Sequence, residues 1–338
     1  MFFQKKIAFF ELEIWEKEYI KKNIKGFKTI FYDEPLTIEN VNKIKDSQII
    51  GIFIYSKITK EILDKLPKLK LITTFSTGYD HIDLSECKKQ NITVCNVPTY
   101  GENTVAEHTF ALILALSRKI FQSIKRTKSG SFEYDGLRGF DLKNKTIGLI
   151  GTGHISSHVA RIANGFEMNI IAYDLNQNPE LIKNYGLKYV DMNTLLKTSD
   201  IISLHIPLND KTKYTINKKN ISLMKPSAIL INTARGGLIE TDALIKALQN
   251  KKIAGAGLDV LEEECAIKEE KQLLSAQFNS NRNIQTLLEN HLLMQLDNVI
   301  ITPHNAFNST EALQRIIDTS IENIVNFEKK PQNIVQVK

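Results

Sequence analysis

Short apolar runs alternate with amphipathic segments along almost the whole chain. Between most of the apolar runs lie stretches with apolar residues at helical spacing, such as 14–22, 37–44 and 59–66. Regular alternation of strands and helices predicts parallel sheets with helices on both faces. We therefore expect an α/β protein with doubly wound parallel sheets. The predicted strands are 6–10, 26–31, 49–54, 69–74, 92–95, 146–150, 169–173, 201–205, 228–232, 253–258 and 299–301.

Two helical patterns and one irregular segment stand out. Residues 101–127 have an apolar middle, which predicts a single long helix packed against a second domain or subunit. Residues 310–327 carry an apolar helical face and predict a final helix. Residues 262–298 contain no clear strand, and they fit one or two inserted amphipathic helices as well as they fit a solvated surface excursion.

Length and composition limit the class of protein. A chain of 338 residues is long enough for two domains. The 42% hydrophobic and 24% charged residues are ordinary for globular proteins, which excludes a disordered or fibrous chain. The net charge of +6 is spread over single or paired lysines, so we expect a solvated surface and no nucleic-acid partner.

The cysteines and the N-terminal residues bear on the compartment. Cys87, Cys95 and Cys265 lack the spacing of a disulfide framework or a metal site, so no metal is expected. The first residues have no signal-peptide pattern, and the most apolar helical stretch, 110–116, is too short to span a membrane. These features predict a soluble protein with no membrane partner, which in a bacterium would be cytoplasmic.

A glycine motif near the middle of the chain predicts a dinucleotide site. A predicted strand runs into Gly151 and Gly153 and then into a helix, whose positive N-terminus can receive a pyrophosphate. Ser156 replaces the usual third glycine, but it is small enough for close packing of helix on strand. Asp174, at the end of the next strand, lies 18 residues after Ser156, near the roughly 20 expected for the acid that binds ribose hydroxyls and repels a 2′-phosphate. The pattern therefore favours NAD over NADP, and its position in mid-chain requires a different domain before it.

Further reactive side chains follow the later predicted strands. Arg235 follows 228–232, Asp259 and three glutamates follow 253–258, and His304 follows 299–301. Taken alone, each would more often be structural, as a satisfied histidine, a salt-bridged arginine or a solvated acidic face. Because the carboxyl ends of parallel strands share one edge of a sheet, their joint placement predicts a common site.

Seven short stretches follow one another in the order found in a known family. They are 76–83 (STGYDHID), 96–100 (NVPTY), 106–108 (AEH), 151–155 (GTGHI), 233–237 (TARGG), 258–260 (LDV) and 302–307 (TPHNAF). With them the chain resembles the D-isomer-specific 2-hydroxyacid dehydrogenases, most of all the D-lactate and D-hydroxyisocaproate dehydrogenase branch. The resemblance implies a Rossmann-type NAD-binding domain, residues 101–305, inserted into a flavodoxin-like substrate domain formed by residues 1–100 and 306–338.

The resemblance also implies catalytic roles. His304 matches the general acid/base, Glu264 its carboxylate partner and Arg235 the residue that holds the substrate; the family spacing Asp-Val-x-x-x-Glu selects Glu264 among the three glutamates. The residue types suit the chemistry, because reduction of a 2-keto acid builds negative charge on an oxygen that imidazolium can protonate. A neighbouring carboxylate stabilises the imidazolium, and a guanidinium grips carboxylate and carbonyl oxygens together.

Substrate and cofactor contacts follow from the same resemblance. Backbone amides around Thr77 and Gly78 match the loop that receives the substrate carboxylate, and Tyr100 and Phe307 match walls of the pocket. The positions that match contacts to NAD are Gly151, Gly153, His154, Ile155, Asp174, Ile206, Pro207, Thr212, Thr233, Ala234, Arg235 and Asp259.

Two features depart from the family pattern. Phe75 stands where the family often has an arginine, which questions a surface or interface contact. The segment 262–298 is longer and more charged than in compact members, and it could cover an active site or an interface.

The predicted function is NAD-dependent reduction of pyruvate to D-lactate, because aromatic Tyr100 and Phe307 suit a small or apolar side chain. A branched 2-keto acid is the close alternative, whereas phosphorylated substrates are disfavoured because no additional cationic cluster is present. An alternative from another class is an NAD-sensing binding protein or corepressor, against which the full set of Arg235, Glu264 and His304 argues. A homodimer through the 101–127 helix is also predicted.

Overall fold

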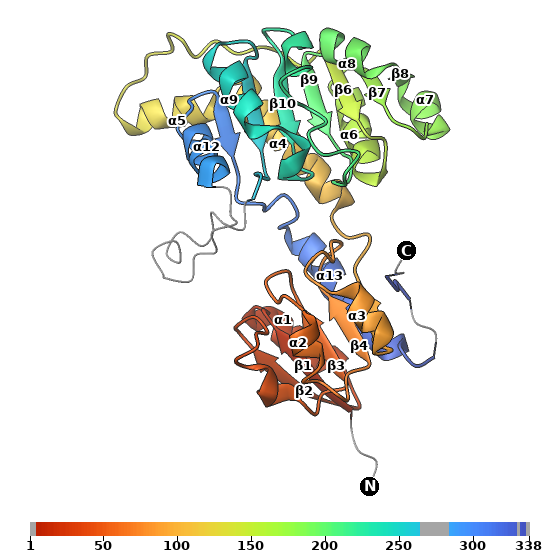
Figure 1. The fold of residues 1–338 in the computed structure, drawn as a ribbon. Helices are drawn as coiled ribbons and strands as arrows, with labels where there is room; N and C mark the ends of the chain where they lie inside the picture. The colour runs from red at the N-terminus through yellow and green to blue at the C-terminus, as the bar shows by residue number, and fades with distance from the viewer. Residues whose placement is uncertain (1–4, 264–283, 330–331, 336–338) are drawn as a thin grey trace. The chain divides into compact units, whose positions relative to one another are not determined.

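The chain folds into two compact units, each around its own parallel sheet. The computed structural model describes residues 5–263, 284–329 and 332–335. Unit 1 comprises Met1–Tyr100 and Ser309–Lys338, and unit 2 comprises Gly101–Asn308, so that unit 2 is inserted into the sequence of unit 1. The sheets have five and seven strands, all parallel, which confirms the predicted fold class of two parallel-sheet α/β domains (Figure 1).

Unit 1 has the strand order β2-β1-β3-β4-β5. Strands β3 and β4 are buried along their whole length, as expected for the middle of a parallel sheet covered on both faces. The elements of unit 1 are β1 (Lys5–Phe10), α1 (Ile14–Asn23), β2 (Phe27–Tyr32), η1 (Val41–Ile44), β3 (Ile49–Ile52), α2 (Lys60–Leu63), β4 (Leu71–Thr74), α3 (Leu84–Lys89), β5 (Thr93–Cys95) and α13 (Thr310–Asn326).

The last part of the chain completes unit 1. Helix α13, blue in Figure 1, packs against α1 and β4. Beyond it, Ile334 forms an antiparallel bridge with Cys95, and the Val335 N–H donates to the Val94 carbonyl at 2.9 Å. Residues more than 200 positions apart in sequence are therefore neighbours at the edge of one sheet.

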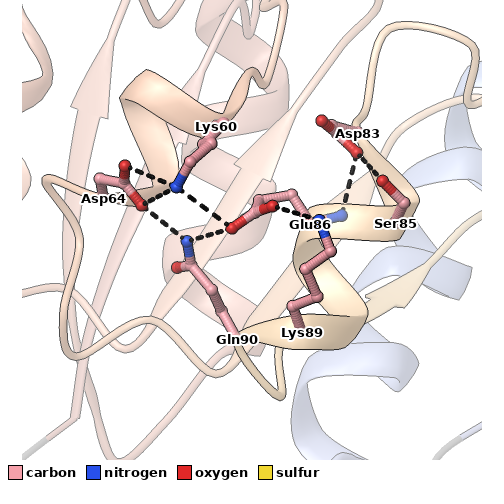
Figure 2. Close-up of polar contacts among 7 residues, drawn as sticks. All are labelled: Lys60, Asp64, Asp83, Ser85, Glu86, Lys89 and Gln90. Atoms are coloured by element: carbon pink, nitrogen blue, oxygen red, sulfur yellow. Dashed lines mark hydrogen bonds and ion pairs between the residues drawn. The ribbon is translucent and has the colours of Figure 1, made fainter.

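A network of polar side chains joins the two short helices α2 and α3 (Figure 2). Lys60 lies 3.0 Å from Asp64 and 3.5 Å from Glu86, and Gln90 donates to both carboxylates at 2.9 and 3.1 Å. At the start of α3, Asp83 caps the helix by accepting the Glu86 N–H at 2.9 Å. Glu86 is buried although its lysine partners are exposed, so the network satisfies a buried carboxylate at the contact of α2 with α3.

Unit 2 has the strand order β12-β11-β10-β9-β6-β7-β8. Its elements are α4 (Glu102–Ser117), α5 (Ile120–Lys128), β6 (Thr146–Ile150), α6 (His154–Gly165), β7 (Asn169–Tyr173), α7 (Pro179–Tyr185), β8 (Lys188–Tyr189), α8 (Met192–Thr198), β9 (Ile201–Leu204), η2 (Ile221–Leu223), β10 (Ile229–Asn232), η3 (Gly236–Leu238), α9 (Thr241–Gln249), β11 (Gly255–Leu258), α12 (Ile284–Met294) and β12 (Val299–Ile301).

Alternate residues of the central strands of unit 2 enter two different apolar cores. Ile229 and Ile231 of β10 belong to the core that includes residues of α4 and α6. Leu230, between them, belongs to the core that includes residues of α8 and α9. This period of two is the pleat of a strand covered on both faces, and the two cores bury the sheet beneath the loops at its carboxyl edge.

The predicted long helix at 101–127 is wrong, because the structure has two helices there. Helix α4 ends at Ser117 and α5 begins at Ile120, with Lys119 in the left-handed region at φ 51°. The Ser117 carbonyl accepts the Phe140 N–H at 3.0 Å. The end of α4 therefore coincides with a contact to a residue 23 positions later in the sequence. The local sequence pattern does not predict where this helix ends.

Other differences concern short elements and the inserted segment. Only η1 and α2, four residues each, form within the predicted helices 37–44 and 59–66, and β8 has only two residues and was not predicted. Within 262–298, α12 is one of the amphipathic helices expected there, while residues 264–283 lie outside the described residues. Phe75 is buried and stacks with Phe9, with ring centroids 6.3 Å apart, so it fills the core of unit 1.

None of the helices within the described ranges is both long and apolar enough to cross a lipid bilayer.

Candidate functional site

The residues that follow the strands of unit 2 lie along one edge of its sheet. Because all seven strands are parallel, their carboxyl ends point the same way. The structure therefore brings most of the predicted site residues of this unit to one edge. They are Gly151, Gly153, His154 and Ile155 after β6, Asp174 after β7, Ile206, Pro207 and Thr212 after β9, Thr233, Ala234 and Arg235 after β10, Asp259 after β11, and His304 and Phe307 after β12.

Glycine is required at Gly151 by its backbone and by its neighbours. Its φ of +97° is strained for an L-residue, and an added Cβ would lie 2.5 Å from the His205 carbonyl oxygen and 2.7 Å from Ile206 Cγ2. Gly153 differs, because an added Cβ would meet no protein atom within 4 Å among the described residues. Its backbone is thus open to a ligand at the start of α6, as a pyrophosphate requires.

Ser156 is fully buried, and its hydroxyl has no hydrogen-bond partner in the described part of the chain. The predicted close packing of α6 on the sheet is therefore present with serine in the third position of the glycine motif.

Asp174 ties the glycine turn to the end of β7. Its carboxylate accepts the Thr152 N–H at 2.6 Å, the Thr152 hydroxyl at 2.9 Å and the Asn176 N–H at 2.9 Å. Burial raises the pKa of Asp174, but the hydrogen bonds from Asn176, Thr152 and Leu175 outweigh it, so the pKa lies below its ordinary value. A carboxylate that stays ionised can accept ribose hydroxyls and repels a 2′-phosphate.

The loop after β9 is closed on itself by Thr212. The Thr212 hydroxyl donates to the Pro207 carbonyl at 2.6 Å and accepts the Asn209 N–H at 2.8 Å. Ile206 lies against the turn at Gly151, as the close approach to its side chain shows. Thr212 therefore shapes the loop that carries Ile206 and Pro207 beside the glycine turn.

Arg235 stands on a segment fixed by Asn232. The Asn232 amide donates to the Arg235 carbonyl at 2.9 Å and accepts the Ala234 N–H at 3.0 Å, while the exposed Arg235 guanidinium donates to the Ala234 carbonyl at 2.7 Å. An added Cβ on Gly236 would lie 2.0 Å from the Leu261 carbonyl carbon. The backbone after β10 therefore passes directly against the backbone after β11.

Asp259 holds the loop that carries His304. The Asp259 side chain is 1% exposed, and its carboxylate accepts the Thr302 hydroxyl, the Asn305 N–H at 3.0 Å and the Ala306 N–H at 2.9 Å. The His304 N–H donates to the Asp259 carbonyl at 2.9 Å. His304 itself has φ 50°, an uncommon conformation for a residue with a side chain, and such strain is frequent at functional sites.

Two residues of this loop network were not among the predicted site residues. His108 of α4 lies 3.0 Å from the Thr302 hydroxyl and 3.5 Å from the Asp259 carboxylate. Thr109, the next residue, lies 3.0 Å from the Thr233 hydroxyl. Helix α4 thus contacts the loops after both β10 and β12. This contact is not apparent from the sequence, because His108 and Thr302 are 194 residues apart.

The three consecutive glutamates separate into different environments. The Glu262 carboxylate accepts hydrogen bonds from the Tyr214 hydroxyl and, at 2.8 Å, from the Thr241 hydroxyl. The bond to Glu262 raises the pKa of Tyr214. Glu263 is exposed. Glu264, the predicted partner of the catalytic histidine, lies outside the described residues, as does Cys265.

The predicted substrate loop belongs to unit 1. Thr77 and Gly78 follow β4, where the Thr77 hydroxyl donates to the Val97 carbonyl at 2.8 Å. Tyr100 is half-buried, and its carbonyl accepts from Arg315 Nε at 2.7 Å.

The site of unit 2 fits a dinucleotide. An open glycine backbone at a helix N-terminus, an ionised acid at the end of the next strand and a third loop beside the turn are the parts that a Rossmann-type site needs. An exposed arginine and a histidine on a braced loop share the same edge. Such an edge can bind a small acid and move a proton beside a nicotinamide.

Comparison with known proteins decides the family. A sequence model of the D-isomer specific 2-hydroxyacid dehydrogenase, NAD binding domain, matches residues 110–306. The chain belongs to this family. It is 36% identical to a 2-hydroxyacid dehydrogenase homolog of Zymomonas mobilis, covering 96% of this chain and 97% of that protein. It is 38% identical to a glyoxylate reductase of Thermococcus litoralis, over 87% and 85% of the two chains.

The same family is found among solved structures. A D-lactate dehydrogenase of Aquifex aeolicus, complexed with NAD and lactic acid, superposes with a TM-score of 0.86 at 37% identity, covering 98% of this chain and 99% of that one. These similarities confirm the family and the D-lactate dehydrogenase branch that the motifs predict. They also confirm NAD as the cofactor and the class of NAD-dependent oxidoreductase.

Proposed function

We propose that the protein reduces pyruvate to D-lactate, with His304 as general acid. The observation that carries the proposal is the braced loop of His304, which Asp259 holds at the same sheet edge as Arg235. The similarity to a D-lactate dehydrogenase that binds lactic acid supports this substrate, and the similarity to glyoxylate reductases supports glyoxylate as a second 2-keto acid.

In the proposed reaction NADH, when bound, supplies the hydride to the carbonyl carbon. The His304 imidazolium gives its proton to the carbonyl oxygen as negative charge develops there, with Glu264 stabilising the charged ring. The Arg235 guanidinium binds carboxylate and carbonyl oxygens and polarises the substrate. The amides of the Thr77–Gly78 loop receive the carboxylate.

We assign the cofactor to unit 2 and the substrate loop to unit 1. Gly151, Gly153, His154, Ile155, Asp174, Ile206, Pro207, Thr212, Thr233, Ala234 and Asp259 are the proposed NAD contacts. Tyr100 and Phe307 are the proposed pocket walls, and their aromatic rings favour a small or apolar substrate side chain.

The test is steady-state NADH oxidation with pyruvate, glyoxylate and a branched 2-keto acid. We expect pyruvate to give the highest kcat/KM, and His304→Gln to lower kcat by at least about 100-fold with little change in the Kd of NADH. Near wild-type turnover of His304→Gln would exclude the general-acid role. Absence of turnover on every 2-keto acid, with tight NADH binding, would favour an NAD-sensing binding protein instead.

We also propose a homodimer through the surface around α5. This helix has no buried residue, and Ile120, Phe121 and Ile124 are each roughly half exposed on it, followed by the exposed Phe132 and Tyr134. Large apolar surfaces of this kind mark interaction sites, and a second copy of the chain is the occupant that we propose. Light scattering should give twice the mass of one chain, and Phe121→Glu should give the mass of one; a wild-type monomer would end the proposal.

A further inference from the structure

The loop after β4 turns two neighbouring carbonyl groups toward side-chain donors. The Asn96 amide donates to the Thr77 carbonyl at 2.8 Å, and the Ser76 hydroxyl donates to the Gly78 carbonyl at 2.6 Å. In a planar trans peptide the N–H points away from the carbonyl of the same unit, and the chain has no cis peptide in its described parts. The N–H groups of Gly78 and Tyr79 therefore face away from these donors, and neither has a hydrogen-bond partner among the residues described.

A directed chain of hydrogen bonds ends on one of these carbonyls. Because Ser76 gives its only hydroxyl proton to Gly78, its 2.7 Å contact with the Thr74 hydroxyl requires Thr74 to donate. Thr74 has then used its own proton, so its 3.2 Å contact with His81 Nε2 requires the ring nitrogen to donate. The order of donation is thus His81 to Thr74 to Ser76 to Gly78, and it fixes the Nε2–H form of the imidazole.

The surroundings favour this arrangement. Thr74 is fully buried and Ser76 nearly so, which leaves no room for solvent to replace a missing donor. Burial lowers the pKa of His81 to about 4, with the nearby Asp80 opposing the shift, so the ring is neutral at neutral pH. A neutral ring protonated at Nε2 supplies the one donor that the chain requires.

We propose that His81, Thr74 and Ser76 form a relay that holds the Gly78–Tyr79 peptide with its amide turned outward, as positioning residues for the substrate carboxylate. The proposal rests on the proposed function, in which this loop receives the carboxylate of a 2-keto acid. Two adjacent, unpaired backbone amides form an anion-binding concavity. Without the relay the peptide could rotate and present its carbonyl oxygen, which repels a carboxylate.

Strand β4 offers a matched pair of substitutions. Thr73 and Thr74 are adjacent and fully buried, but the Thr73 hydroxyl has no hydrogen-bond partner in the part of the chain that the structure describes. Valine has nearly the same shape as threonine, so each change removes one hydroxyl. We expect Thr74→Val to raise the KM for pyruvate about tenfold, the loss of one net hydrogen bond. Its kcat and the Kd of NADH should stay within about twofold of wild type, because NADH is assigned to unit 2.

Thr73→Val is expected to leave all three constants within about twofold, and Ser76→Ala to behave like Thr74→Val. Thermal unfolding of each variant identifies any that fails to fold. Equal KM values for Thr74→Val and Thr73→Val, with both folded, would overturn the relay.

Nitrogen-15 NMR of the histidine rings tests the relay without any turnover. We expect His81 of the wild-type chain in the Nε2–H form, and a loss of that preference in Thr74→Val but not in Thr73→Val. An Nδ1–H ring in the wild type would refute the relay. A wild-type chain that reduces no 2-keto acid, yet shows the Nε2–H ring, would refute the proposed function and not the order of donation.

Discussion

Alanine at Gly151 and at Gly153 should separate the fold of the glycine turn from its binding of NAD. At Gly151, a side chain in the left-handed region costs ~1–2 kcal/mol, and the contacts of its Cβ with His205 and Ile206 add ~1–3 kcal/mol of overpacking. Together they cost about 2–5 kcal/mol, which at roughly 2–4 °C per kcal/mol for a unit of this size lowers Tm by about 4–20 °C. At Gly153 the φ of −75° suits alanine and the Cβ meets no described protein atom within 4 Å, so Tm should hardly change.

Although Gly153→Ala should leave Tm nearly unchanged, it should weaken the binding of NADH. Its added methyl group points into the space assigned to the pyrophosphate, and loss of a hydrogen bond to a charged group raises the Kd of NADH roughly 10- to 100-fold. Scanning calorimetry gives Tm, and fluorescence titration with NADH gives Kd for both variants. The reasoning fails if Gly153→Ala is as unstable as Gly151→Ala, or if it binds NADH as wild type does.

Three further substitutions test the edge of unit 2. Arg235→Lys should raise the KM for pyruvate at least about 100-fold, because an ammonium cannot reproduce the two-pronged hydrogen bonding of a guanidinium to a carboxylate. It should not lower Tm, because Arg235 is exposed. Unchanged kinetics would remove Arg235 from the site. Asp174→Ala should shift the ratio of kcat/KM from NADH toward NADPH, since it removes the charge that opposes a 2′-phosphate; an unchanged ratio contradicts that role. Asp259→Asn should lower Tm and kcat together, because an amide turns an N–H group toward one of the two backbone N–H donors of the loop, at about 2–3 kcal/mol; calorimetry and NADH oxidation showing wild-type values would refute it.

The alternation of buried strands made the fold class readable from the sequence. Strands such as β6, β7 and β12 lie where the apolar runs predict them, because each is fixed by its own pattern and by the turn chemistry beside it. The interruption between α4 and α5 at Lys119 and the two-residue strand β8 were not predicted, since contacts with distant residues determine them. The alternation of side chains in a strand is visible in the local sequence. The end of a helix, by contrast, can depend on a distant residue that hydrogen-bonds to one of the helix carbonyl groups, as Phe140 does to Ser117.

The position of the candidate site residues at one sheet edge was predictable from the sequence, whereas the contacts that support them were less so. Strand ends located Gly151, Asp174 and Arg235, because parallel topology places them on one edge. The bracing of the His304 loop by Asp259 was not apparent, since a buried carboxylate that accepts three hydrogen bonds has the same sequence signature as one aimed at a ligand.

The return of the chain to unit 1 imposes an order on biosynthesis. Thr310–Asn326 form helix α13 and Ile334 forms the bridge with Cys95, yet these residues leave the ribosome only after the whole of unit 2. Unit 2 can therefore complete its fold while unit 1 still lacks a helix and exposes the apolar side of its sheet. The nascent protein should depend on chaperones during that interval, and substitutions that weaken α13 should lower the yield of folded protein more than its activity per molecule.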